Sequence, residues 1–140
     1  MEPIREVIAA ERLDRVDPLI VNTPTETVVG GQRRSVERLL EALRVPALPL
    51  PTVSTVHCPI AREVEPAYRS LHLLTTTPPP GVTFYSAGWG RAYTPTRETA
   101  AEAIVAQALH TVDFPAVVRQ RIATACGSSW KPAPARPAHA

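Results

Sequence analysis

Proline is the residue type that most limits what this chain can fold into, because it makes up 16 of the 140 residues. Proline fixes φ and has no backbone N–H, so it ends helices and interrupts strands. Regular elements must therefore be short. The chain also has only two Trp, three Tyr and two Phe, so aliphatic residues and Ala must supply most of the core. A chain of this length has room for about one modest domain.

Composition and charge exclude several classes of protein. The sequence is 44% hydrophobic and 20% charged, which is ordinary for a globular domain and excludes wholesale disorder, collagen and a coiled coil. No run approaches the roughly 18 apolar residues of a membrane-spanning helix. The net charge of +2 is too small for a dedicated nucleic-acid binder. We therefore expect neither a membrane nor a nucleic acid as partner.

The cysteines and the N-terminus predict a cytoplasmic protein. Cys58 and Cys126 lie far apart and match no metal-binding spacing. The first residues lack the basic and apolar blocks of a secretory signal. We expect reduced thiols, no metal and no cofactor.

The first half of the chain predicts two helices and three strands. A surface helix is expected over 4–16, ended by Asp17-Pro18. Two β-prone runs, 19–21 and 27–29, are separated by turn residues and predict a hairpin. A helix beginning at Ser35 and ended by Pro46 presents one apolar stripe. A strand is expected over 47–56, weakened by its own prolines.

The second half predicts two helices around one strand. The first helix covers 60–71, with Pro66 in its first regular turn, and a rigid loop follows over 75–81. A strand covers 82–86, and 87–90 is a flexible turn. Thr94 is the expected N-cap of a helix that runs to about Val112. That helix is expected to bury an apolar set: Ile104, Val105, Ala108 and Leu109.

The order strand, strand, helix, strand, helix, strand predicts an α+β fold. It suits a small antiparallel sheet with two helices on one face, the ferredoxin-like arrangement. We divide the chain into an N-terminal helix (1–17), a ferredoxin-like subdomain (18–90), a helical segment (91–122) and a disordered Pro/Ala-rich tail (123–140).

His57 is the main candidate for chemistry, since the chain contains no P-loop, G-x-G-x-x-G, H-E-x-x-H or G-x-S-x-G motif. It directly follows an apolar strand and precedes Cys58-Pro59, so rigid neighbours fix its place, as a general base requires. From the residues alone, an ordinary half-buried histidine bonded to a loop carbonyl is the favoured alternative. Asp113 and Glu63 are candidates to orient the ring.

The other histidines and Cys58 carry no catalytic prediction. His72 and His110 lie late in helices, where a cation is mildly favoured, and His139 lies in the tail. Cys58 is not expected to pair with His57, because adjacent strand residues point to opposite faces.

Most of the chain, about 18–119, resembles one known family. An Asn-x-Pro hairpin with a Val-Val-x-Gly strand (Asn22–Gly31) is followed by a helix and by a strand that leads into Val56-His57-Cys58-Pro59. A Phe-Tyr-Ser strand (84–86) and a helix with Gln107 complete the pattern. This order is similar to the acyl-CoA:acyl-carrier-protein transacylases of fatty acid and polyketide synthases. Around His57 and 85–91 it is most similar to those of polyunsaturated fatty acid synthases.

The resemblance implies a function for His57. In the family, the histidine at this position activates a serine, which takes a malonyl or acyl group from coenzyme A and passes it to acyl carrier protein. It also implies that the segment after residue 90 belongs to an α/β-hydrolase-like subdomain. Coenzyme A would then be a substrate carrier, and acyl carrier protein the partner.

Two departures from the family pattern lead to the fragment hypothesis. The Gly-His-Ser-x-Gly nucleophile motif is absent, and Cys58 stands where the family commonly has Ser. We therefore expect the C-terminal part of an acyltransferase, inactive alone and completed by another half or by other synthase domains. The alternative is a non-catalytic module that binds a carrier protein or a partner chain. An RNA-recognition module is disfavoured, because Phe84 and Tyr85 would lie on opposite faces.

Overall fold

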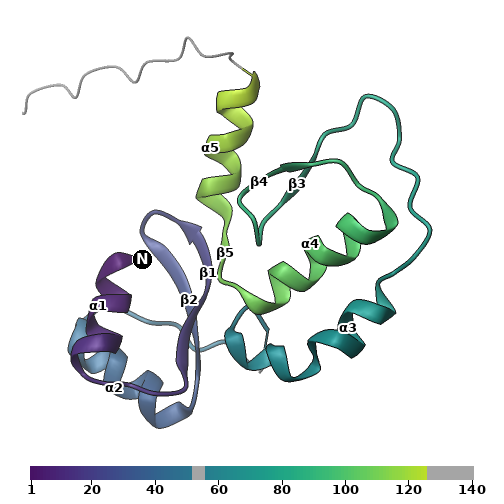
Figure 1. The fold of residues 1–140 in the computed structure, drawn as a ribbon. Helices are drawn as coiled ribbons and strands as arrows, with labels where there is room; N and C mark the ends of the chain where they lie inside the picture. Colours follow the sequence, from purple (N-terminus) through teal and green to yellow (C-terminus); the bar gives the residue numbers. More distant parts are fainter. Residues whose placement is uncertain (52–55, 126–140) are drawn as a thin grey trace, which may run out of the picture.

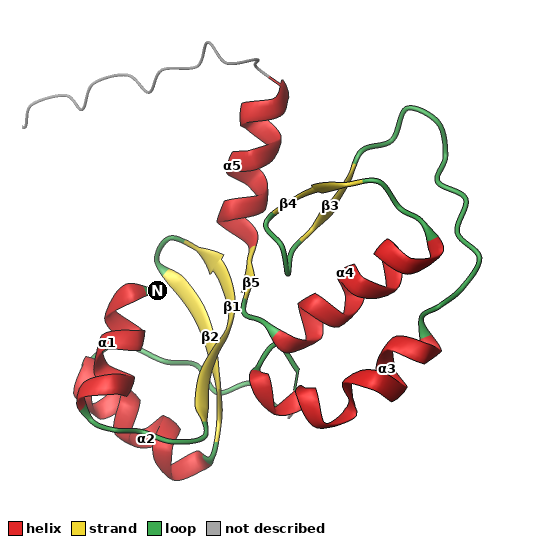
Figure 2. Ribbon diagram, viewed as in Figure 1, coloured by secondary structure: helices red, strands yellow, loops and turns green. Residues whose placement is uncertain are grey.

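The computed structural model describes residues 1–51 and 56–125 and shows an α+β fold with short elements (Figures 1 and 2). An N-terminal group of elements contains α1 (Glu2–Ala10), β1 (Val16–Thr23), β2 (Glu26–Gly31) and α2 (Arg33–Leu43). A second group contains the 3₁₀ helix η1 (Pro59–Val64), α3 (Glu65–Leu71), β3 (Phe84–Ser86), β4 (Arg91–Tyr93) and α4 (Arg97–Leu109). The chain then continues through β5 (Val112–Asp113) and α5 (Phe114–Ala125).

A three-stranded sheet connects the two groups. The hairpin expected between 19–21 and 27–29 is confirmed as antiparallel β1 and β2. Strand β5 pairs in parallel with the other edge of β1, which gives the order β2-β1-β5. The hydroxyl of Thr111 donates to the carbonyl of Pro18 at 2.8 Å, next to this pairing. The end of α4 is thereby held against the middle of the hairpin.

The core of the N-terminal group lies between α1, α2 and the hairpin. Its centre is Leu39, which has no exposed surface, with Leu13 and Val16 buried beside it. Helix α1 ends at Ala10, shorter than the expected 4–16, because Arg12 and Arg15 take left-handed φ values of 50° and 51° and turn the chain into β1. Helix α2 is confirmed; it ends at Leu43, and its C-cap Arg44 is left-handed, two residues before Pro46.

The strand expected over 47–56 is wrong for its described residues. Residues 47–51 and 56 have no strand assignment, and 52–55 lie outside the described residues. Two of the residues that were to alternate, Leu48 and Leu50, are 85% and 60% exposed, so nothing covers an apolar face there. Pro49 and Pro51 also remove two donors that a strand ladder would need.

The sheets of the described residues also differ from the ferredoxin-like expectation. They form a mixed three-stranded sheet and a separate β3–β4 hairpin, where one antiparallel sheet with two helices on one face was expected. Strand β5, which has two residues, adds to β1 in parallel and makes the first sheet mixed. The coarser expectation of an α+β fold is confirmed.

The second group is built around α4. Thr96 is its N-cap, where Thr94 was expected: the Thr96 hydroxyl accepts the Thr99 N–H at 3.1 Å, and the Thr99 hydroxyl accepts the Thr96 N–H at 2.7 Å. The helix ends at Leu109, and it buries Val105, Ala108 and Leu109 as expected. Ile104 is 37% exposed, which corrects its predicted burial. The helix expected over 60–71 is confirmed as η1 followed by α3.

Within the described ranges, no helix is both long and apolar enough to cross a membrane. No cluster of metal-binding side chains occurs there either. Most of the predicted disordered tail, 126–140, lies outside the described residues.

Candidate active site around His57

His57 is held by two hydrogen bonds to the last turn of α4. Its backbone N–H donates to the carbonyl oxygen of Ala108 at 2.7 Å. Its ring nitrogen Nδ1 lies 2.6 Å from the carbonyl oxygen of Gln107. Both backbone and ring are therefore tied to the same short stretch of another element.

The end of α4 supplies these acceptors because of where the helix stops. The last four carbonyls of a helix have no partner within it. The Ala106 carbonyl accepts the N–H of His110 at 3.0 Å. The next two carbonyls, those of Gln107 and Ala108, accept hydrogen bonds from the ring and the backbone of His57.

The Gln107 contact fixes the tautomer of the imidazole. A carbonyl oxygen can only accept a hydrogen bond, so Nδ1 must carry the proton. In the neutral ring, Nε2 is then the unprotonated nitrogen and has a lone pair that can accept a proton. No described residue hydrogen-bonds to Nε2. This is the arrangement that a general base requires.

The backbone at His57 is strained. Its φ of 65° lies in the left-handed region, which costs a residue other than glycine about 1–3 kcal/mol. Three arginines share this conformation in turns or at a helix end. At His57 the same conformation brings both the amide and the ring onto α4, so the strain serves to position the side chain.

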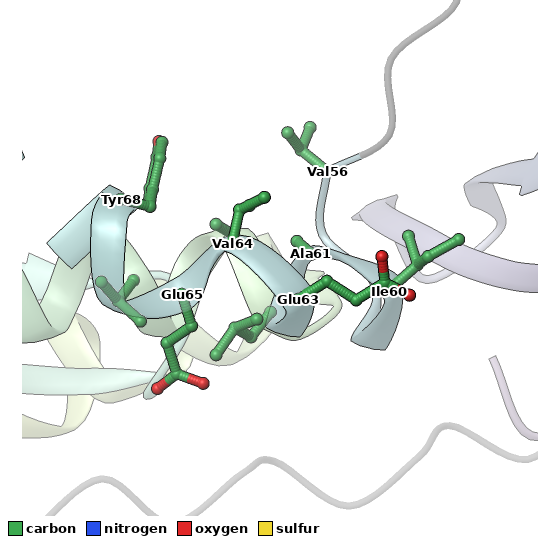
Figure 3. A pocket seen from close by; sticks show the side chains of 10 residues that line it. Val56, Ile60, Ala61, Glu63, Val64, Glu65 and Tyr68 are labelled. Atoms are coloured by element: carbon green, nitrogen blue, oxygen red, sulfur yellow. The ribbon is translucent and has the colours of Figure 1, made fainter.

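An apolar hollow of about 370 Å³ borders this site (Figure 3). Its wall on α4 includes Ala108, whose carbonyl binds the His57 amide. The rest of the lining includes Val105 and Leu109 of α4, Val56, and residues of η1 and α3: Ile60, Ala61, Glu63, Val64, Glu65 and Tyr68. Ile60 and Val64 are 52% and 57% exposed, so this apolar face is open to solvent.

No family model matches the sequence, and no curated protein matches it. Solved structures do match. A malonyl CoA-acyl carrier protein transacylase from Clostridium perfringens superposes with a TM-score of 0.73 and 20% identity, over 88% of this chain and 40% of that one. The acyltransferase domain from module 8 of the salinomycin polyketide synthase gives 0.73 and 25%, over 88% and 29%. The transacylase from Burkholderia pseudomallei gives 0.72 and 22%, over 89% and 43%.

The chain has the fold of part of an acyltransferase domain. It spans 29% to 43% of the length of these three acyltransferases. The kind of domain implied by the sequence resemblance is thus supported by the fold. At these identities the likeness concerns the fold, and activity, substrates and partners belong to the proposal below.

Neither of the two carboxylates that were expected to orient the His57 ring is its hydrogen-bond partner at Nδ1. Asp113 accepts the N–H of Ala116 at 2.8 Å and so caps α5. Glu63 lines the hollow. The group that orients the ring is the backbone carbonyl of Gln107. A half-buried ring bonded to a backbone carbonyl was the alternative expected from the residues alone, but the sequence could not identify which carbonyl, because any residue type supplies one.

Cys58 is buried directly after His57. Burial raises the pKa of its thiol, and the nearby charge of Asp17 raises it further, while backbone hydrogen bonds at Ile60 and Ala61 act in the opposite direction. A raised pKa keeps the thiol protonated, so Cys58 is a poor nucleophile. The expectation that Cys58 does not pair with His57 rested on a strand that the structure does not form at these residues, so it stays a prediction.

Proposed function

We propose that this chain supplies the histidine base of an acyltransferase that moves an acyl group from coenzyme A to acyl carrier protein. The observation that carries the proposal is the His57 ring, with Nδ1 held by the Gln107 carbonyl at 2.6 Å and Nε2 left as an acceptor. The acyltransferase fold of the matched structures supports it.

His57 would act through Nε2 in both halves of the reaction. The proton of a serine hydroxyl passes to Nε2 as Oγ attacks the thioester carbonyl, and the proton then goes to the departing thiol of coenzyme A. In the second half, Nε2 takes the proton of the carrier protein's phosphopantetheine thiol as its sulfur attacks the acyl-serine. The serine leaves and recovers that proton. The Gln107 carbonyl and the end of α4 stabilise the imidazolium in between.

The nucleophile in this proposal comes from a segment outside this sequence, which contains no Gly-x-Ser-x-Gly. The matched acyltransferases are more than twice as long as the part that this chain covers. We place the missing segment over the open apolar hollow of η1, α3 and α4, because covering it buries Ile60 and Val64 and brings new groups next to His57.

Substrate class within the family stays a prediction from sequence. The likeness to polyunsaturated fatty acid synthases rests on residues around His57 and 85–91, and the malonyl group is inferred from the family alone. A non-catalytic binding module is the second candidate, because the same open apolar face also suits a partner without a nucleophile.

The experiment is reconstitution. The coding sequence upstream of Met1 is read for a Gly-x-Ser-x-Gly segment, which is then produced together with this chain. Transfer of labelled malonyl and acetyl groups from coenzyme A to a carrier protein is measured. His57→Ala should lower the rate by roughly 10²–10⁴-fold.

His72→Ala is the control, because the Nδ1 nitrogen of His72 also lies close to a backbone carbonyl, that of Tyr68 at 2.7 Å. The His72 ring packs on Tyr68, which lines the hollow, so this variant should lower the rate far less than His57→Ala. Equal rates for His57→Ala and the unmodified chain would overturn the proposal. An upstream sequence without the motif, together with no transfer, would favour the binding module.

A further inference from the structure

The turn between β3 and β4 has no part in the function proposed so far, although its sequence, Ser86-Ala87-Gly88-Trp89-Gly90, is distinctive. Ser86 is buried, its hydroxyl accepts the N–H of Trp89 at 3.3 Å, and its carbonyl accepts the N–H of Gly90 at 2.8 Å. Gly90 has a φ of 64°, which glycine adopts without strain. Ser86 therefore closes the turn by accepting two hydrogen bonds from its far end.

Aromatic contacts fix the turn to β4. The Trp89 ring meets the Tyr93 ring edge-on with centroids 5.4 Å apart. The Arg91 guanidinium lies 5.2 Å from the centroid of the Trp89 ring. Such contacts hold a ring in one orientation. The apex of the turn, at Gly88, consequently has a defined position.

Gly88 packs directly on the backbone of α4. A Cβ at this position would lie 2.5 Å from the nitrogen of Gln107, 2.6 Å from the carbonyl carbon of Ala106 and 2.9 Å from its oxygen. These are backbone atoms, which cannot rotate away as a side chain can. The peptide that Gly88 touches is the one immediately before the carbonyl that binds Nδ1 of His57.

We propose that Gly88 is a positioning residue: the Ser86–Gly90 turn supports the last turn of α4 and so aims the Gln107 carbonyl at His57. Its meaning for catalysis rests on the proposed function, but its effect on the His57 ring does not. Any side chain at position 88 must move the peptide between Ala106 and Gln107. The 2.6 Å contact to Nδ1 is then lost or lengthened, and the ring is free to take its other tautomer.

The test measures which ring nitrogen of His57 carries the proton. The full chain is labelled with ¹⁵N-histidine, and the two ring nitrogens of His57 are assigned with His57→Gln. In the unmodified chain Nδ1 of the neutral ring carries the proton. Gly88→Ala should produce a measurable population with the proton on Nε2. His72, with its own Nδ1 contact to Tyr68, should not change and serves as an internal reference.

Gly81→Ala is the control, because a Cβ at Gly81 would meet nothing within 4 Å. Its φ of 75° gives this variant a backbone penalty that Gly88→Ala does not carry, since φ at Gly88 is not positive. A change in the His57 ring that occurs only in Gly88→Ala therefore comes from contact with α4 and not from the loss of a glycine. If Gly88→Ala does not fold, Ser86→Ala replaces it. Loss of one hydrogen bond in the turn should speed exchange of the His57 backbone N–H by roughly fivefold, since such a bond contributes about 1 kcal/mol.

An unchanged His57 ring in folded Gly88→Ala would overturn the inference, and so would unchanged exchange in Ser86→Ala. This failure is distinct from failure of the proposed function. If the unmodified chain already carries its proton on Nε2, the proposed base is wrong. If that chain is as expected and Gly88→Ala does not differ, only the positioning role of Gly88 is wrong.

Discussion

The Nδ1 nitrogen of His57 and the carbonyl oxygen of Gln107 lie 2.6 Å apart although fifty residues separate them in the sequence. A side-chain carboxylate usually orients a catalytic histidine. At His57 the backbone carbonyl of Gln107 makes this contact instead, so the position of the last turn of α4 determines the orientation of the ring. The stability and position of α4 are therefore the natural targets for testing the account.

The N-cap of α4 gives a stability prediction. Thr96→Ala removes the acceptor of the Thr99 N–H and should lower the free energy of unfolding by about 1 kcal/mol. Urea unfolding of the two chains measures the difference. Thr94→Ala is the control, because only the backbone carbonyl of Thr94 takes part, accepting the Thr99 hydroxyl at 2.7 Å. A larger loss for Thr94→Ala would show that the helix is capped there instead.

Asp17 gives a prediction of pH dependence. Burial raises the pKa of this carboxyl above its ordinary value. Between the unfolded and folded pKa values, the folded chain binds more protons, so the free energy of unfolding falls as pH rises through that window. At neutral pH the charged carboxylate is destabilising. Asp17→Asn should therefore be more stable than the unmodified chain at pH 7, with the advantage fading under acidic conditions.

Urea unfolding over a pH series measures this difference. Asp14→Asn, at an exposed aspartate nearby, controls for the loss of one negative charge. If Asp17→Asn were less stable at pH 7, Asp17 would have a favourable charged interaction that the structure does not show.

The open hollow gives a prediction about association. Val64 is 57% exposed, so Val64→Ser should change the stability of the isolated chain by no more than about 0.5 kcal/mol. In complex with the nucleophile-bearing segment, the exposed part of Val64 would be buried, which contributes about 1 kcal/mol, or roughly fivefold in affinity. Val45→Ser, an equally exposed valine outside the hollow, should leave affinity unchanged. Equal binding of both variants would place the interface elsewhere.

The N-terminal group was largely predictable because its signals are local. The apolar stripe of α2 and the turn residues between two β-prone runs each fix an element without help from distant parts. The place of His57 was not predictable in this way, because the strand that was expected to lead into it is absent from the described residues and its contacts are with the distant end of α4.

The remaining features depend on contacts between distant parts of the chain. Strand β5 has two residues and exists only through its pairing with β1. Thr94 and Thr96 are both typical N-cap residues, and the choice depends on Thr99, which replaces the usual Glu or Gln of a capping box. The Gln107 carbonyl and Gly88 act through backbone, which leaves little trace in residue type.

The proposed base at His57 depends above all on which of its ring nitrogens carries the proton. ¹⁵N spectra of the full chain, with the ring nitrogens assigned through His57→Gln, show which nitrogen is protonated in the neutral ring. We expect a proton on Nδ1, donated to the Gln107 carbonyl, and no proton on Nε2. A proton on Nε2 with a bare Nδ1 would contradict this expectation, because His57 could not then accept a serine proton from the position that the structure gives it.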